Sequence, residues 1–148
     1  MRVMTLGRYN AFCAKLPHTT HVVQWGDAHV WKVAGKVFAI AHESEAAADD
    51  IHVTFKCSEL SYDLLKDEAG CRPAPYLASR GLKWIQWMGP ESVDESALLK
   101  YIAESHRLAA LGLSQRTQRS LGVGAFPPAA HPPARPNAKP SIVSRRVR

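Results

Sequence analysis

Apolar residues follow a helical pattern at the start of the chain. The i, i+3, i+4, i+7 spacing of a single helix face is met by Tyr9, Phe12, Cys13 and Leu16. This spacing predicts a first helix over about residues 4–16, which Pro17 ends because proline cannot continue a helix.

The pattern then changes to one typical of strands. β-branched and aromatic residues predict strands at 21–25, 29–34 and 36–42, with a tight turn at 26–28. The acidic, Ala-rich segment 44–50 predicts a loop at the tip of a hairpin. In 51–57, odd positions are apolar and even positions are polar, which predicts a fourth strand with one face in the core.

The second half of the chain begins with a helix and a loop. Ser58 is a suitable N-cap for a helix that runs to about Glu68, with its leucines expected to be buried. These leucines are Leu60, Leu64 and Leu65. The prolines and glycine of 71–82 predict a long loop.

A fifth strand is predicted at 83–88. Because successive side chains of a strand alternate, Trp84 and Trp87 should face opposite sides, so only one of them should enter a one-sided core. Ser92 and Glu95 then form a capping box for a last long helix. Its apolar stripe consists of Leu98, Leu99, Ile102 and Ala109. Gly112 should end this helix, and a short basic helix should follow at 114–121.

The predicted order is helix, four strands, helix, strand, helix. Four consecutive strands with short connections favour an antiparallel arrangement, because parallel pairs need longer crossovers. The fold class is therefore predicted to be α+β, with a sheet of about five strands and helices packed on one of its faces.

Composition divides the chain in two. Six of the ten prolines lie between residues 126 and 141, interleaved with alanine. We therefore expect a folded domain over 1–121 and an extended, disordered tail over 122–148. The net charge of +6 divides in the same way. Residues 1–121 hold 14 basic and 13 acidic side chains. The tail holds no acid and five cations, Arg135, Lys139, Arg145, Arg146 and Arg148.

Cysteine usage and the N-terminus bear on the compartment. The three cysteines have no framework spacing, and Cys13 and Cys57 fall where a small buried apolar residue would serve. The N-terminus lacks the pattern of a secretory signal, and no apolar run is long enough to span a membrane. These observations predict a cytoplasmic protein.

Several segments together resemble the MmcQ/YjbR family. The matches are the runs 35–39 and 53–57, the run Arg-Pro-Ala-Pro-Tyr-Leu at 72–77, Trp84, and Ser105 on the last helix. The resemblance covers about residues 5–120. It implies a frataxin-like α+β fold and a DNA-binding protein with a double-wing arrangement. His106 departs from the family pattern, which has Tyr after the Ser, and the tail lies outside the pattern.

Signatures of catalysis are absent from the sequence. It contains no GxSxG, no phosphate-binding glycine loop and no HExxH, so we expect no enzymatic activity. His18, His21 and His29 are the nearest candidates for metal ligands, but no cysteine lies beside them. We therefore predict no metal site and no cofactor.

A nucleic-acid surface is the better candidate. Lys and Trp on a sheet face can contact phosphates and stack on bases, and a basic loop can act as a wing. The candidate residues are Lys32, Lys36, Lys56, Arg72, Tyr76, Arg80, Lys83 and Trp84. The cations of the tail would add further phosphate contacts. The hypothesis is weak DNA binding with low sequence specificity. The alternative is a module that binds a protein partner or a small ligand, and neither reading needs a membrane.

Overall fold

One antiparallel sheet of six strands organises the fold, with the order β1-β2-β3-β4-β6-β5. The computed structural model describes residues 4–44, 50–75 and 77–121. The strands are β1 (Thr19–Gln24), β2 (Ala28–Val33), β3 (Lys36–Glu43), β4 (Ile51–Lys56), β5 (Cys71–Pro73) and β6 (Trp84–Trp87). The first four follow one another as predicted, because each is joined to the next by a short connection.

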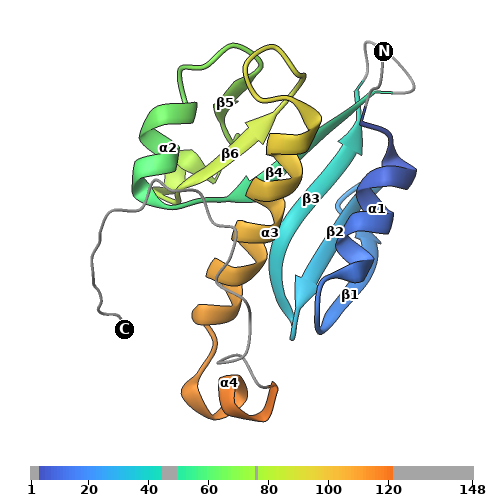
Figure 1. The fold of residues 1–148 in the computed structure, drawn as a ribbon, viewed down its shortest axis with the longest axis vertical. Coiled ribbons are helices and arrows are strands. Elements are labelled where there is room, and N and C mark those ends of the chain that lie inside the picture. Colours follow the sequence, from blue (N-terminus) through green and yellow to red (C-terminus); the bar gives the residue numbers. More distant parts are fainter. Residues whose placement is uncertain (1–3, 45–49, 76, 122–148) are drawn as a thin grey trace.

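Three helices cover one face of this sheet, α1 (Leu6–Lys15), α2 (Glu59–Leu65) and α3 (Glu95–Leu111) (Figure 1). Helix α4 (Gln115–Leu121) follows α3 beyond the end of the sheet, and a 3-10 helix, η1 (Ala78–Arg80), precedes β6. Buried side chains of α1, α2 and α3 join those of the sheet in a single core. The predicted α+β class is therefore confirmed. The predicted tail, 122–148, lies outside the described residues.

The strand count was predicted as about five, and the sixth strand, β5, was missed. Residues 71–82 were expected to form a loop throughout, but Cys71–Pro73 pairs with β6. Proline is tolerated there because β5 is an edge strand and that position needs no backbone donor. The short strand places Arg72 opposite Gln86.

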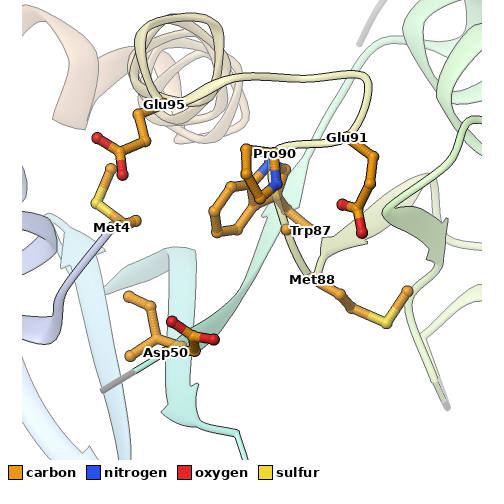
Figure 2. A pocket seen from close by; sticks show the side chains of 9 residues that line it. Met4, Asp50, Trp87, Met88, Pro90, Glu91 and Glu95 are labelled. Atoms are coloured by element: carbon orange, nitrogen blue, oxygen red, sulfur yellow. The ribbon is translucent and has the colours of Figure 1, made fainter. Parts of the chain in front are cut away.

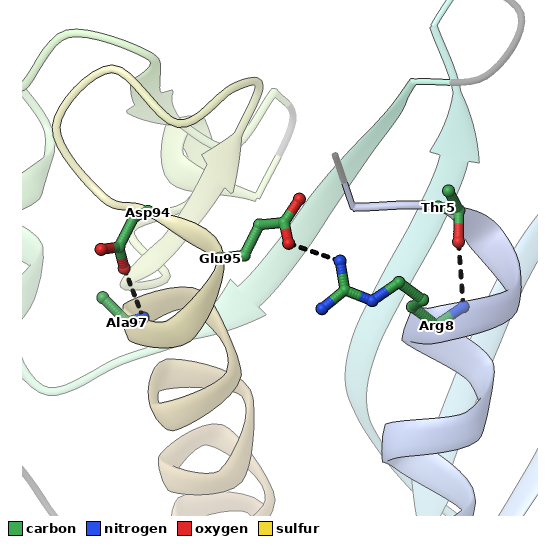
Figure 3. Close-up of polar contacts among 5 residues, drawn as sticks. All are labelled: Thr5, Arg8, Asp94, Glu95 and Ala97. Atoms are coloured by element: carbon green, nitrogen blue, oxygen red, sulfur yellow. Dashed lines mark hydrogen bonds and ion pairs between the residues drawn. The ribbon is translucent and has the colours of Figure 1, made fainter. Parts of the chain in front are cut away.

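The N-caps of the helices agree only in part with those predicted from the sequence. Thr5 caps α1 and Asp94 caps α3, each accepting a hydrogen bond from the backbone N–H three residues later (Figure 3). The predicted capping box of Ser92 and Glu95 is wrong, because Asp94 is an equally good cap closer to the helix. Glu95 instead forms an ion pair with Arg8 of α1.

One further burial prediction is wrong, and another is confirmed. Leu60 and Leu64 are 42% and 55% exposed, because the short helix α2 turns only Ser61 and Leu65 inward. Trp84 and Trp87 face opposite sides of β6 as predicted, and only Trp87 joins the core between sheet and helices, although Trp84 is also buried. Trp87 belongs to the core and donates to the Val93 carbonyl oxygen, with 2.7 Å between nitrogen and oxygen.

A buried hydroxyl joins β3, β4 and α3. The register between β2 and β3 passes from Ala39 to Val37, so Phe38 is the extra residue of a β-bulge. The fully buried Ser105 of α3 donates to the Phe38 carbonyl oxygen at 2.6 Å and accepts from the Lys56 N–H at 2.8 Å. The hydroxyl therefore takes the place of a ladder bond where the pairing of β3 with β4 ends.

The Ser105→Ala variant should lose about 3 kcal/mol of unfolding free energy, because it leaves a buried carbonyl and a buried N–H without partners. Urea unfolding measures this loss. Ser96→Ala, at an exposed position of the same helix, is the matched control and should change stability by less than about 0.5 kcal/mol. Equal effects of the two substitutions would contradict the bridging role.

Candidate functional site

The face of the sheet away from the helices, here called the open face, carries most of the polar strand residues. Val53, Phe55, Ile85 and Trp87 belong to the core, so the residues that alternate with them point the other way. The polar and aromatic members near the centre of this face are Lys32, His42, His52, Thr54, Lys56, Arg72, Trp84 and Gln86.

Every charged strand residue of the described open face is cationic at pH 7. Lys32 lies on β2, Lys56 on β4 and Arg72 on β5, which are alternate strands of the sheet. Adjacent strands are separated by about 4.8 Å, so the strands that carry neighbouring cations lie about 10 Å apart. The three side chains form an oblique row, because Arg72 is level with Thr54 and is therefore displaced by two strand positions from Lys56.

Arg72 is held against the sheet by a buried amide. Its Nε donates to Oε1 of Gln86 at 2.7 Å, and Gln86 is only 3% exposed. This bond uses one of the five guanidinium donors, and Arg72 itself is exposed. The arrangement orients a guanidinium that can contact a phosphate or carboxylate in solution.

Lys56 stands in an environment that disfavours its own charge. Burial lowers the pKa of its ammonium group, and the nearby Lys36 lowers it further. An anion that approaches the group stabilises the charged form, so binding of a phosphate relieves this unfavourable environment. At Lys56, a bound anion would therefore offset the unfavourable effect of burial.

Two histidines lie beside the row. His42 and His52 are opposite one another on β3 and β4, with ring centroids 6.0 Å apart. Burial lowers the pKa of His52, as do His42 and Arg72, while Asp50 raises it. His52 is therefore mainly uncharged at neutral pH and adds no cation to the row there.

Not all predicted residues lie on the open face. Lys36 pairs with Val33 and lies over the end of α3 at Gly112. Lys83 lies before β6, with its Nζ 4.9 Å from the ring centroid of Tyr62 on α2. Arg80 is exposed at the end of η1.

The remaining predicted residues divide into one that is buried and several that are not described. Trp84 reaches the open face but is 8% exposed, so it offers little ring surface for stacking. Tyr76 lies outside the described residues, as do the cations of the tail, Arg135, Lys139, Arg145, Arg146 and Arg148.

Sequence reasoning missed Gln86, which fixes Arg72. The alternation of 83–88 could have placed Gln86 on the same side as Trp84. No local signal indicates the bond itself, because it depends on β5, a three-residue strand that contains proline.

A separate cavity of about 310 Å³ lies on the helix side, near the start of α3. Glu95, Asp50 and Glu91 are placed around it, with Trp87 and Pro90 between them (Figure 2). Oε1 of Glu95 pairs with Arg8, but its Oε2 is buried and has no hydrogen-bond partner. Carboxylates that line one cavity favour a ligand that carries positive charge and donates hydrogen bonds.

The titratable groups do not suggest a metal or a nucleophile. Among the residues that the structure describes, no three His, Cys, Asp or Glu side chains converge as metal ligands. The three cysteines are buried and outside any disulfide, and burial raises the pKa of Cys57 to about 12 and that of Cys71 to about 11. These thiols therefore stay protonated and poorly nucleophilic.

The YjbR family model matches residues 14–108, which include the strands and most of α3. The chain belongs to the YjbR family. YjbR is not a known enzyme family. No curated protein matches the chain. Within the described ranges, no helix is long and apolar enough to cross a membrane.

Solved structures confirm the YjbR fold. Protein DR2400 of Deinococcus radiodurans, described as having a DUF419 domain, superposes with a TM-score of 0.69 at 16% identity, covering 87% of this chain and 96% of its own. A protein from Pseudomonas syringae superposes with a TM-score of 0.58 at 18% identity, covering 72% of this chain and 99% of its own. At these identities the similarity concerns the fold alone.

His106 is 3% exposed and packs edge-on against Phe38. Its Nε2 lies 2.8 Å from the carbonyl oxygen of Pro17, to which it can donate only if that nitrogen carries the proton. Burial lowers the pKa of His106 below its ordinary value of 6.5, with a smaller effect of His18 in the same direction and an opposing effect of the Pro17 bond. The folded protein therefore favours the neutral ring.

This shift predicts a loss of stability in acid. The unfolded state binds a proton at His106 more readily than the folded state does. The contribution of His106 to the free energy of unfolding is therefore complete above about pH 6.5 and falls as the pH drops toward the folded-state pKa. Urea unfolding between pH 7.5 and pH 5 should show the decline, and His106→Phe should make it shallower. A titration followed by NMR that gives His106 a pKa above 6.5 would contradict this prediction.

Proposed function

We propose that this YjbR protein binds the phosphate backbone of nucleic acid on the open face, weakly and with low sequence specificity. The observation that carries the proposal is the row of Lys32, Lys56 and Arg72 on the open face, where the described strand positions hold no carboxylate. Phosphate contacts give affinity and position a protein, but they do not read a sequence. The buried thiols fit the reducing cytoplasm in which such a ligand occurs.

The structure favours backbone contact over base contact. Trp84 lies between Lys56 and Arg72 but is almost covered, so stacking on unpaired bases contributes little. The binding energy should therefore come from ion pairs and counterion release, which act on single strands and duplexes alike. We expect Arg80, exposed in the loop beside β5, and the tail to add contacts of the same kind.

Neutralising the row should weaken binding and its salt dependence. The triple variant K32Q/K56Q/R72Q should make the slope of log K against log salt shallower by about 2 on single-stranded DNA, because each lost phosphate contact removes about 0.7. Fluorescence anisotropy with labelled oligonucleotides over a salt series measures the slope. The control K100Q/R116Q/R119Q removes the same charge from exposed positions on α3 and α4.

The two triple variants distinguish binding that depends on the positions of the three open-face cations from binding that depends only on the net charge of the protein. The control should keep most of the affinity and slope, and equal losses in both would attribute the binding to net charge alone. A third variant with Gln at Arg135, Lys139, Arg145, Arg146 and Arg148 tests the tail. If this variant abolishes all binding, or if the unmodified chain binds no DNA at low salt, the open face does not bind nucleic acid.

The cavity supports a second candidate function, the binding of a small organic cation. Its three carboxylates, from Asp50, Glu91 and Glu95, line one space without converging as metal ligands among the described residues. Separated carboxylates over an apolar floor suit a linear aliphatic diamine, whose ammonium groups donate and whose methylenes pack on Trp87 and Pro90.

Butane-1,4-diamine should bind this cavity in the millimolar range, and butane-1,4-diol, which has the same shape without charge, should not. The shift of the Trp87 indole N–H in NMR spectra reports binding, because this group bonds to Val93 beside the cavity. Asp50→Asn and Glu91→Gln should each weaken binding, while Glu59→Gln, on α2, should not. Equal shifts with the diamine and the diol would contradict recognition of charge.

A further inference from the structure

The two edges of the sheet differ in how they are protected. At one edge, β5 is three residues long and contains an exposed Arg72 and Pro73. Short length, charge and proline all discourage pairing with another strand. At the other edge, β1 spans six residues, Thr19–Gln24, pairs with β2, and contains neither a charged residue at pH 7 nor a proline.

Apolar surface surrounds the unprotected edge. Val22 and Val23 are 36% and 49% exposed, and alternation places one on each face of β1. Trp25, at the start of the turn to β2, is 64% exposed. A strand that adds to this edge would cover these side chains and satisfy the outer backbone groups of β1.

We propose that β1 pairs antiparallel with β1 of a second copy of this chain, about a two-fold axis. The charges at the two ends of β1 favour a second copy of this chain as the partner. Thr19 Oγ1 donates to the carbonyl oxygens of Cys13 and Leu16, so the end of α1 is tied to the start of β1. Lys15 therefore lies near the start of β1, and Asp27 lies in the turn just beyond its end.

Antiparallel pairing brings opposite charges together. It aligns the start of β1 with the end of the partner strand, so each Lys15 approaches the other copy's Asp27. Both residues are exposed, and neither belongs to the ion pairs found among the described residues. A symmetric pair makes this contact twice, whereas an unrelated strand would need matching charges of its own.

The symmetry also determines the shape of the dimer. A two-fold axis perpendicular to the sheet keeps both open faces on one side, so the two sheets form one continuous surface. This surface carries the row of Lys32, Lys56 and Arg72 twice. The pairing itself does not depend on nucleic-acid binding, and it is tested without any nucleic acid.

Sedimentation velocity of the full chain over a concentration series tests the proposal. The mass should rise with concentration from 16.3 kDa toward twice that value. Val23→Lys places two like charges at the paired edges and should weaken the dimer about tenfold. Leu64→Lys, at a similarly exposed apolar position on α2, is the matched control and should leave the mass unchanged.

The proposed ion pair between Lys15 and the other copy's Asp27 is tested by reversing the charge of Lys15 and then removing the charge of Asp27. Lys15→Glu should weaken the dimer, because two carboxylates then meet. Asp27→Asn in the Lys15→Glu background should restore part of it, and Asn tolerates the left-handed backbone at φ 50° as Asp does. These surface substitutions keep the test decisive if Val23→Lys impairs folding, which circular dichroism would detect.

Three outcomes would overturn the proposal. One is a chain that stays monomeric at every concentration, which would leave the β1 edge open to a strand from another protein. The second is a dimer that is equally stable in the Val23→Lys and Leu64→Lys variants, which would place its interface elsewhere. The third is a dimer unaffected by Lys15→Glu.

Discussion

The hydroxyl of Ser105 is the contact on which the arrangement of the sheet depends. At the bulge of Phe38 the pairing of β3 with β4 ends, and Ser105 satisfies one backbone group on each strand. The bond also positions α3 against the middle of the sheet. Because α3 covers this side, the other side of β4, with Lys56, remains an open face. The open face is therefore a consequence of where α3 packs against the sheet.

The sequence predicted the parts of the fold whose signal is local and periodic. The alternation of 51–57 placed Phe55 in the core and Lys56 opposite it, and the stripe of the last helix placed Leu98 and Ile102 in the core. The errors concern elements that are defined by their partners. Cys71–Pro73 becomes a strand only because β6 lies beside it, and Leu64 remains exposed because α2 lies at the end of the sheet.

The candidate site shows the same division between local and long-range information. Periodicity was sufficient to place Lys32 and Lys56 on one face. Lys83 is two positions before Ile85, so the alternation of strand side chains could have placed it on the helix side of the sheet. There its ammonium group lies near the ring of Tyr62. Arg72 joins the row only through β5 and Gln86, which are brought together by long-range pairing. The sequence singled out Arg72 as part of a basic loop, but local patterns could not have predicted that it lies on the same sheet face as Lys32 and Lys56.

A nearly neutral domain can still present a cationic face. Residues 1–121 hold 14 basic and 13 acidic side chains, but the two signs are not evenly mixed. Asp50, Glu91 and Glu95 surround a cavity near the start of α3, while the charged strand residues described on the open face are cations. At physiological ionic strength charges beyond about 8 Å are largely screened. An approaching polyanion therefore senses the local row rather than the total charge, so the near-neutral count does not argue against binding there.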